Sequence, residues 1–197
     1  GTDAVRIQGT APGGTPRTQI RTESSGGGQG SAIHVSAPLL HVRGGGGLVS
    51  TTSGEAPAGN IVIQDTDRVK ITGFSASAPG STESLSVIAA LALGSNGDAG
   101  TIQLTADDLR LRNGGSIVSL TFLGSGDGGN INIDVPSIRV QGISPRTSVA
   151  GISSASFGEG NAGTIDIQTR SSGQRWGTSG FLSACPGKCW GHQYCGD

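Results

Sequence analysis

Five glycine-rich segments of the chain each lead into an isoleucine that opens an apolar–polar–apolar triplet. The triplets read IHV, IVI, IQL, INI and IDI, and they begin at Ile33, Ile61, Ile102, Ile131 and Ile165. Alternation with a period of two predicts short β-strands in which the two outer residues of each triplet share one face. Five copies of one pattern indicate a repeat architecture.

These triplets are called triplet a, and two further sets, triplets b and c, accompany them. Triplet b begins at Leu40, Val69, Leu109 and Ile138, with an earlier copy at Val5. Triplet c begins at Ile20, Leu48, Ile88, Ile117 and Ile152. Triplet b starts 7 or 8 residues after a, and a starts 13 or 14 residues after c, whereas the step from b to c varies from 8 to 19 residues. Two constant steps and one variable step predict stacked windings with loops of variable length at one place, above all in residues 73–87.

Three short strands per repeat, separated by glycine turns, are typical of a parallel β-helix, a solenoid in which each winding stacks about 4.8 Å from the last. We therefore expect an all-β fold over residues 1–170, with about five rungs and three short strands per rung. Glycine supplies 36 of the 197 residues, because corners need positive φ angles and close approach of stacked backbones. A glycine-rich linker with chance triplets and a β-sandwich are the alternatives. Chance does not hold two steps constant, and sandwich strands are usually longer.

The overall composition excludes several classes of protein. The net charge of −1 gives no global attraction to nucleic acid. The longest apolar run is VIAALAL, Val87 to Leu93, which is too short to cross a bilayer, so we expect no membrane span. The chain begins with Gly1 and contains no Met, and we therefore interpret it as a piece of a longer polypeptide.

Two segments resemble a known family. LRLRNGGSIVSLTFLGSGDGGNINI (residues 109–133) and GISSASFGEGNAGTIDIQ (residues 151–168) are similar to repeats of filamentous-haemagglutinin-type exoproteins. These are large surface proteins that Gram-negative bacteria export by two-partner secretion. The resemblance implies a right-handed parallel β-helix, an extracellular or outer-membrane surface location, a role as adhesin or matrix scaffold, and an outer-membrane transporter as partner of the parent protein.

The middle residues of triplet b form a possible binding surface, which we call the basic row. Its members are Arg6, His41, Lys70, Arg110 and Arg139. If the windings stack as expected, these side chains lie one above another on the outer face, about 5 Å apart. Stacked like charges repel unless they are screened or paired, so the row could bind an anionic polysaccharide or a host-cell glycan. The alternative is a solvated face that prevents aggregation, with Asp3, Asp67 and Asp108 as partners.

The basic row is extended by Arg43 and Arg112, which lie two residues further along two of the strands.

No set of residues predicts catalysis or a cofactor. His34 and His41 are middle members of triplets and should face solvent, and neither has a Ser and an Asp at a recognised triad spacing. Asp107 and Asp108 are adjacent, so a strand would point them to opposite sides. We expect a non-catalytic structural or adhesive segment. The alternative is a carbohydrate-active β-helix enzyme, a polysaccharide lyase or hydrolase, which would need carboxylates at matching outward positions in neighbouring repeats, and the triplets provide none.

The last segment, residues 171–197, differs sharply in composition from the repeats. It holds both Trp, the only Tyr and all three Cys of the chain. The spacing of Cys185, Cys189, His192 and Cys195 could supply four zinc ligands, although it matches no zinc motif that we recognise. A disulfide with one free thiol, a disordered tail and an out-of-frame tail are the other interpretations. We expect an irregular tail and no metal site.

Overall fold

The computed structural model describes residues 4–9, 18–75, 84–94, 96–142 and 150–169. All regular secondary structure in these ranges is β-strand, and none of their residues lies in a helix. The tail at 171–197 lies outside the described residues, as do parts of the three longer steps from triplet b to triplet c.

The larger sheet has eight strands, all paired in parallel. Its main path has the order β1-β4-β6-β10-β12-β15, while β3 also pairs with β6 and β13 also pairs with β10. The strands are β1 (Val5–Gln8), β3 (Ile33–Ser36), β4 (Leu39–Arg43), β6 (Ile61–Thr72), β10 (Ile102–Arg112), β12 (Ile131–Asp134), β13 (Ser137–Gln141) and β15 (Ile165–Gln168).

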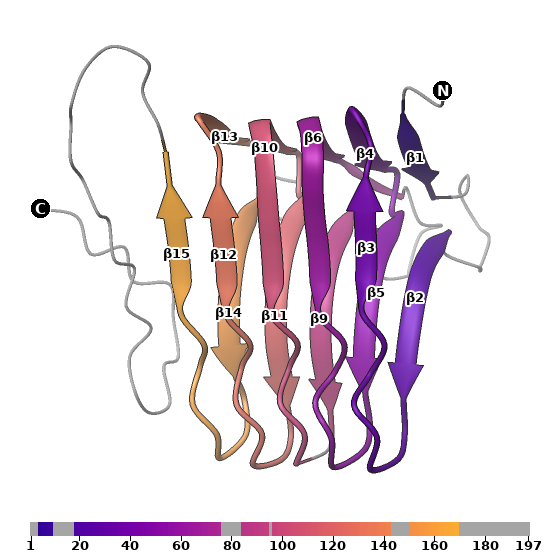
Figure 1. The fold of residues 1–197 in the computed structure, drawn as a ribbon, viewed down its shortest axis with the longest axis vertical. Coiled ribbons are helices and arrows are strands. Elements are labelled where there is room, and N and C mark those ends of the chain that lie inside the picture. The colour runs from indigo at the N-terminus through magenta and orange to yellow at the C-terminus, as the bar shows by residue number, and fades with distance from the viewer. Residues whose placement is uncertain (1–3, 10–17, 76–83, 95, 143–149, 170–197) are drawn as a thin grey trace, which may run out of the picture.

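The second sheet has five parallel strands in the order β14-β11-β9-β5-β2. They are β2 (Gln19–Ser24), β5 (Gly47–Thr52), β9 (Val87–Leu93), β11 (Ser116–Phe122) and β14 (Gly151–Ser156). Figure 1 shows this sheet behind the strands that carry triplet a, and the chain passes repeatedly between the two layers. A short antiparallel pair, β7 (Phe74–Ser75) and β8 (Ser84–Leu85), lies at the base of the longest step from b to c. The all-β parallel architecture is confirmed and is consistent with a parallel β-helix.

The register of the larger sheet aligns the isoleucines of triplet a. Ile61 pairs with Ile33 and with Ile102, and the column continues through Ile131 to Ile165. Ile61, Ile102 and Ile131 have no exposed surface. Triplets b and c align in the same way, with Val69 beside Leu109 and Ile88 beside Ile117. Burying such columns removes apolar surface from water at about 25 cal/mol per Å², and they form the core between the sheets.

Triplets a and b both lie in the larger sheet, and they form separate strands in β3 with β4 and in β12 with β13, but not in the two windings between these pairs. They merge into one continuous strand in β6 and in β10. The a-to-b step is 8 residues in β6 and 7 in β10, and the register shifts between Leu104 and Ala106 to absorb the extra residue. Asp65 lies at this β-bulge with φ of 50°, a conformation that Asp tolerates better than most residues.

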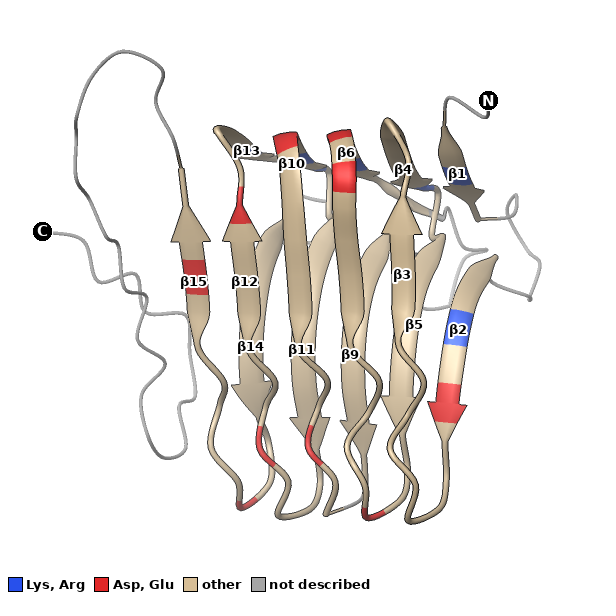
Figure 2. Cartoon of the chain, viewed as in Figure 1, with Lys and Arg blue, Asp and Glu red and all other residues tan. Residues whose placement is uncertain are grey.

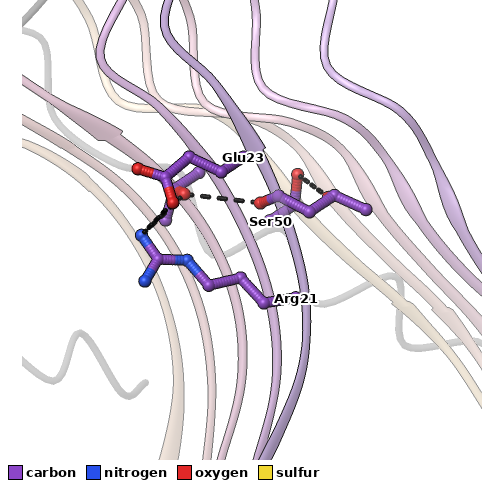
Figure 3. Close-up of polar contacts among 5 residues, drawn as sticks. Arg21, Glu23 and Ser50 are labelled. Carbon is purple, nitrogen blue, oxygen red and sulfur yellow. Dashed lines mark hydrogen bonds and ion pairs between the residues drawn. The ribbon is translucent and has the colours of Figure 1, made fainter.

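Small hydroxyl side chains fill the inner face of the second sheet beside its aliphatic column. Ser50 and Ser119 are fully buried, and Ser119 Oγ donates a hydrogen bond to the carbonyl oxygen of Gly100 at 3.2 Å. At the β2 edge, Thr22 Oγ1 donates to Ser50 Oγ at 3.0 Å, close to the ion pair between Arg21 and Glu23 (Figure 3). Ser119, and likewise Thr121 with the carbonyl oxygen of Asp127, satisfy carbonyl groups of the corners that would otherwise be buried without partners.

The corners between triplets c and a need glycine because stacked backbones touch there. A Cβ on Gly100 would lie 2.2 Å from the carbonyl oxygen of Gly59, and one on Gly129 would lie 2.2 Å from that of Gly100. The expected positive φ angles occur instead in the turns that leave the strands, including the two short b-to-c turns. Gly44 and Gly45 both have positive φ, as do Asn113 and Gly114, which favours Gly-Gly and Asn-Gly at these positions.

Candidate ligand-binding surface

The basic row lies on five neighbouring strands of the larger sheet. Arg6 on β1 pairs with His41 on β4, which pairs with Lys70 on β6. Lys70 pairs with Arg110 on β10, and Arg110 pairs with Arg139 on β13. Figure 2 shows blue segments, which mark Lys and Arg, near the labels β1, β4, β6 and β10, whereas His41 carries no colour there. The predicted alignment is confirmed, and adjacent strands place its members about 4.8 Å apart along the backbone.

Exposure varies along the basic row. Arg6 and Arg139, at its two ends, are exposed, whereas His41, Lys70 and Arg110 are half-buried. Long cationic side chains of this kind lay their methylene groups along the sheet and keep their charged groups in water. A ligand would therefore meet a row of charges on a largely preformed surface.

Two flanking columns add further cations to this face. On one side, Arg43 and Arg112 alternate with neutral Gln8, Thr72 and Gln141. Arg43 donates a hydrogen bond from Nη2 to Oε1 of Gln8 at 2.6 Å. Alternation of this kind avoids placing like charges directly opposite each other. Arg43 and Arg112 therefore widen the basic row, as predicted.

On the other side, the paired column runs through Leu39, Arg68, Asp108 and Ser137. Asp108 Oδ2 lies 2.7 Å from Arg110 Nε and 3.2 Å from Arg68 Nε. The contact with Arg110 is ionic, because its buried Nε makes no hydrogen bond. Asp108 is the only acid among the paired residues of the basic row and its two flanking columns. Its expected role as a partner is confirmed, whereas Asp3 lies outside the described residues.

His41 is the titrating member of the basic row. Burial lowers the pKa of His41 below its usual value of 6.5. Repulsion lowers that pKa further, from Arg43, Lys70 and Arg6 in that order. Near pH 7 the row therefore consists of a neutral imidazole flanked by permanent cations.

The triplets carry no acid at matching outward positions, but the corners of neighbouring repeats do. Asp98 and Asp127 each lie four residues before the isoleucine of triplet a. The Oδ1 atom of Asp98 accepts a hydrogen bond from the backbone N–H of Asp127 at 2.8 Å, and Oδ1 of Asp127 accepts one from the N–H of Asn161 at 2.7 Å. Because each carboxylate caps the next corner, these contacts hold the stack together.

A second pair of acids lies on the outer face of the larger sheet, near β15. Asp134 on β12 and Asp166 on β15 line an open hollow of about 220 Å³, together with Gln103, Asn132 and Gln168. Gln168 Nε2 donates a hydrogen bond to Asp166 Oδ2 at 3.4 Å. The triplet comparison missed this pair because the two acids occupy different positions in their strands. Two carboxylates from neighbouring strands in one hollow are what the enzyme alternative requires.

The candidate zinc ligands Cys185, Cys189, His192 and Cys195 lie outside the described residues. Within the described ranges, no group of three or more His, Cys, Asp or Glu side chains could hold a metal ion.

Comparisons with protein-family models, with curated proteins and with solved structures found no match. In the part of the chain that is described, no helix is long and apolar enough to span a membrane.

Proposed function

We propose that the chain is a non-catalytic, structural and adhesive segment of a large secreted bacterial surface protein, and that its basic row binds anionic polysaccharide. In this proposal the segment is a right-handed parallel β-helix of about five rungs. The observation that carries the binding role is the register of Arg6, His41, Lys70, Arg110 and Arg139 across five strands.

A row of cations at a regular spacing suits a polymer better than a small anion. Like charges on directly opposed residues destabilise a sheet, and only Asp108 lies among them as a counter-charge. A polyanion laid along the row would relieve repulsion at several strands at once, and each further contact would be intramolecular once the first had formed. Affinity should therefore rise with polymer length and fall with salt.

The fold and the location are supported by separate arguments. Crossover connections between parallel strands of one sheet are right-handed in about 98% of cases, which favours a right-handed coil. The surface location and the outer-membrane transporter partner rest on the resemblance of residues 109–133 and 151–168 to exoprotein repeats. These two segments stack on each other through β11 with β14 and through β12 with β15, as copies of one repeat would.

The test is binding of the full chain to polygalacturonate and to dextran sulfate, measured by native affinity electrophoresis. The wild type should be retarded by at least one polyanion, and 0.5 M NaCl should abolish the retardation. A variant with Arg6→Gln, Lys70→Gln, Arg110→Gln and Arg139→Gln should lose most of the binding. Unchanged, salt-insensitive retardation of that variant would exclude the basic row as the site.

A charge-matched pair of single variants provides the control. Lys70→Gln removes one cation from the centre of the row, whereas Arg21→Gln removes one from the second sheet, where Arg21 pairs with Glu23 at 3.1 Å (Figure 3). The first should weaken polyanion binding and the second should not. Equal effects would mean that only the net charge matters.

The second candidate function is that of a carbohydrate-active enzyme, and the hollow with Asp134 and Asp166 favours it. One carboxyl group would act as general acid and the other as base or nucleophile. The assay is release of reducing sugar, or of unsaturated uronate, from the same polysaccharides. Activity that Asp134→Asn and Asp166→Asn abolish, and that Asp107→Asn retains, would establish the enzyme. No turnover of any polymer would favour the adhesive segment.

A further inference from the structure

Exposed apolar side chains gather at one end of the second sheet. Leu93 ends β9, Phe122 ends β11, and Phe157 directly follows β14. Phe122 is 47% exposed and Phe157 is 61% exposed, and their rings meet edge to face with centroids 6.3 Å apart. Together with Leu123, these residues form what we call the aromatic patch. Soluble proteins rarely expose grouped large apolar side chains without a partner.

The backbone at this patch is strained in a way that exposes another apolar side chain. Leu123 has φ of 58° and is 60% exposed. On the neighbouring strand, the position equivalent to Leu123 is Gly94, which has φ of 69°. Glycine adopts such a positive φ without strain, whereas leucine does so at a cost in free energy. Strained residues of this kind concentrate at functional sites. Leu123 thus adds apolar surface to the patch at the expense of stability.

A hollow with hydrogen-bonding groups adjoins the patch. It has a volume of about 440 Å³ and is lined by Leu123, Gly124 and Gly158 together with the polar side chains of Asn96, Ser125 and Glu159. Ser125 Oγ donates a hydrogen bond to Asn96 Oδ1 at 3.0 Å, which orients the amide. Apolar faces beside convergent polar groups are the usual composition of a small-molecule or saccharide site.

From this arrangement we propose that the aromatic patch and the adjoining hollow bind a neutral polysaccharide. The C–H faces of its sugar rings would pack on Phe122, Phe157 and Leu123, and its hydroxyl groups would hydrogen-bond to Asn96, Ser125 and Glu159. This inference deepens the proposed adhesive function and rests on it, but it concerns a different surface from the basic row.

The charge of the surroundings selects a neutral ligand. Glu159 lies in the hollow itself, and the corners beside it carry Asp127 and Asp98. Figure 2 shows acidic segments along these corners, below the strands of both sheets. An anionic polymer would be repelled here, whereas the hydroxyl groups of a neutral sugar donate readily to carboxylates.

The size of the patch argues against a second protein copy. Phe122, Phe157, Leu93 and Leu123 expose at most about 500 Å² together, given that a whole aromatic side chain buries about 150 to 250 Å². A specific protein interface takes about 800 Å² from each partner. A polysaccharide needs only a few rings in contact.

The test uses the full chain in native gels that contain hydroxyethylcellulose, mixed-linkage β-glucan or galactomannan. The wild type should be retarded by at least one of them, and 0.5 M NaCl should leave the retardation unchanged. The variant Phe122→Ala/Phe157→Ala should weaken the apparent affinity at least tenfold, and Phe157→Ala alone should give an intermediate loss. Val140→Ala, which trims another exposed apolar side chain, should have no effect. Circular dichroism and the thermal midpoint establish that each variant is folded.

The variant in which the four cations of the basic row are replaced by Gln should keep its neutral-polymer binding, which separates this inference from the polyanion site. Failure of all three polymers to retard the wild type would overturn it. So would equal retardation of the wild type and the double variant, or self-association of the wild type that the double variant loses.

Discussion

Lys70 on β6 lies directly opposite Arg110 on β10, so two cations stand side by side at the centre of the basic row. Arg110 is also paired with Asp108, at 2.7 Å between Nε and Oδ2. The sheet therefore tolerates the cation pair with one half-buried counter-charge beside it. The side chain of Asp108 is only 14% exposed. Replacing it should therefore change both the free energy of unfolding and the affinity for a polyanion.

Asp108→Asn should lower the free energy of unfolding by about 1 to 2 kcal/mol, because it removes the counter-charge of both Arg110 and Arg68. Urea denaturation measures the change. Asp107→Asn is the matched control, since Asp107 is the exposed neighbouring acid, and it should change stability by less than about 0.5 kcal/mol. Equal losses in the two variants would contradict the pairing.

The stability of the protein should depend on His41 below neutral pH. Its folded pKa lies below the unfolded value of 6.5, so the unfolded chain binds the proton more tightly. The free energy of unfolding should therefore fall as the pH decreases from 7.5 to 5.5, and His41→Gln should reduce this dependence. An identical pH profile for the wild type and His41→Gln would contradict the shift.

The pH dependence of polyanion binding through His41 should have the opposite sign to that of stability. A bound anion favours the imidazolium and raises the pKa of His41, so affinity for polygalacturonate should increase as the pH falls from 7.5 to 5.5. The same titration with His41→Gln should show a weaker dependence. If the two profiles coincide, His41 does not contact the ligand.

Gly100→Ala should destabilise the protein by at least about 2 kcal/mol, because the new Cβ would lie 2.2 Å from the backbone oxygen of Gly59. Gly27→Ala is its control, since a Cβ there meets nothing within 4 Å, and its effect should stay within about 0.5 kcal/mol. Thermal unfolding of both variants measures the difference. A harmless Gly100→Ala would mean that the corners do not stack this closely.

The strand register could be predicted from sequence because two of the three steps between triplets, a to b and c to a, are nearly constant. The column from Ile33 to Ile165 and the alignment of Arg6 with Arg139 both follow from it. The one anomalous a-to-b step marks the β-bulge at Asp65. A repeat gives this information because a residue and its equivalents occupy the same position in every copy.

The merging of triplets a and b into one strand could not be predicted, because spacing alone does not say how sharply the chain bends between them. Triplet c is the weakest sequence signal for a related reason. Its third residue is small or carries a hydroxyl group in every copy. Ser119 and Ser154 at this position donate hydrogen bonds to carbonyl oxygens of the corners, at Gly100 and Gly129.

The corner acids and the aromatic patch were missed although the signal was present. Asp98 and Asp127 align when residues are counted back from triplet a. Leu93, Phe122 and Phe157 align only when they are counted forward, five residues from the start of triplet c. Comparing the triplets alone leaves both sets out, since the acids lie in the corners and the apolar residues lie at or just after the ends of the strands.

The most direct test of the account is a methyl–methyl NOE spectrum of the full chain labelled at the isoleucine δ1 methyl groups. The predicted result is a set of cross-peaks linking Ile33 to Ile61, Ile61 to Ile102, Ile102 to Ile131 and Ile131 to Ile165, as the parallel register requires. A well-dispersed spectrum without these cross-peaks would show that the isoleucines do not stack. The strand register that aligns the basic row and the aromatic patch would then be wrong.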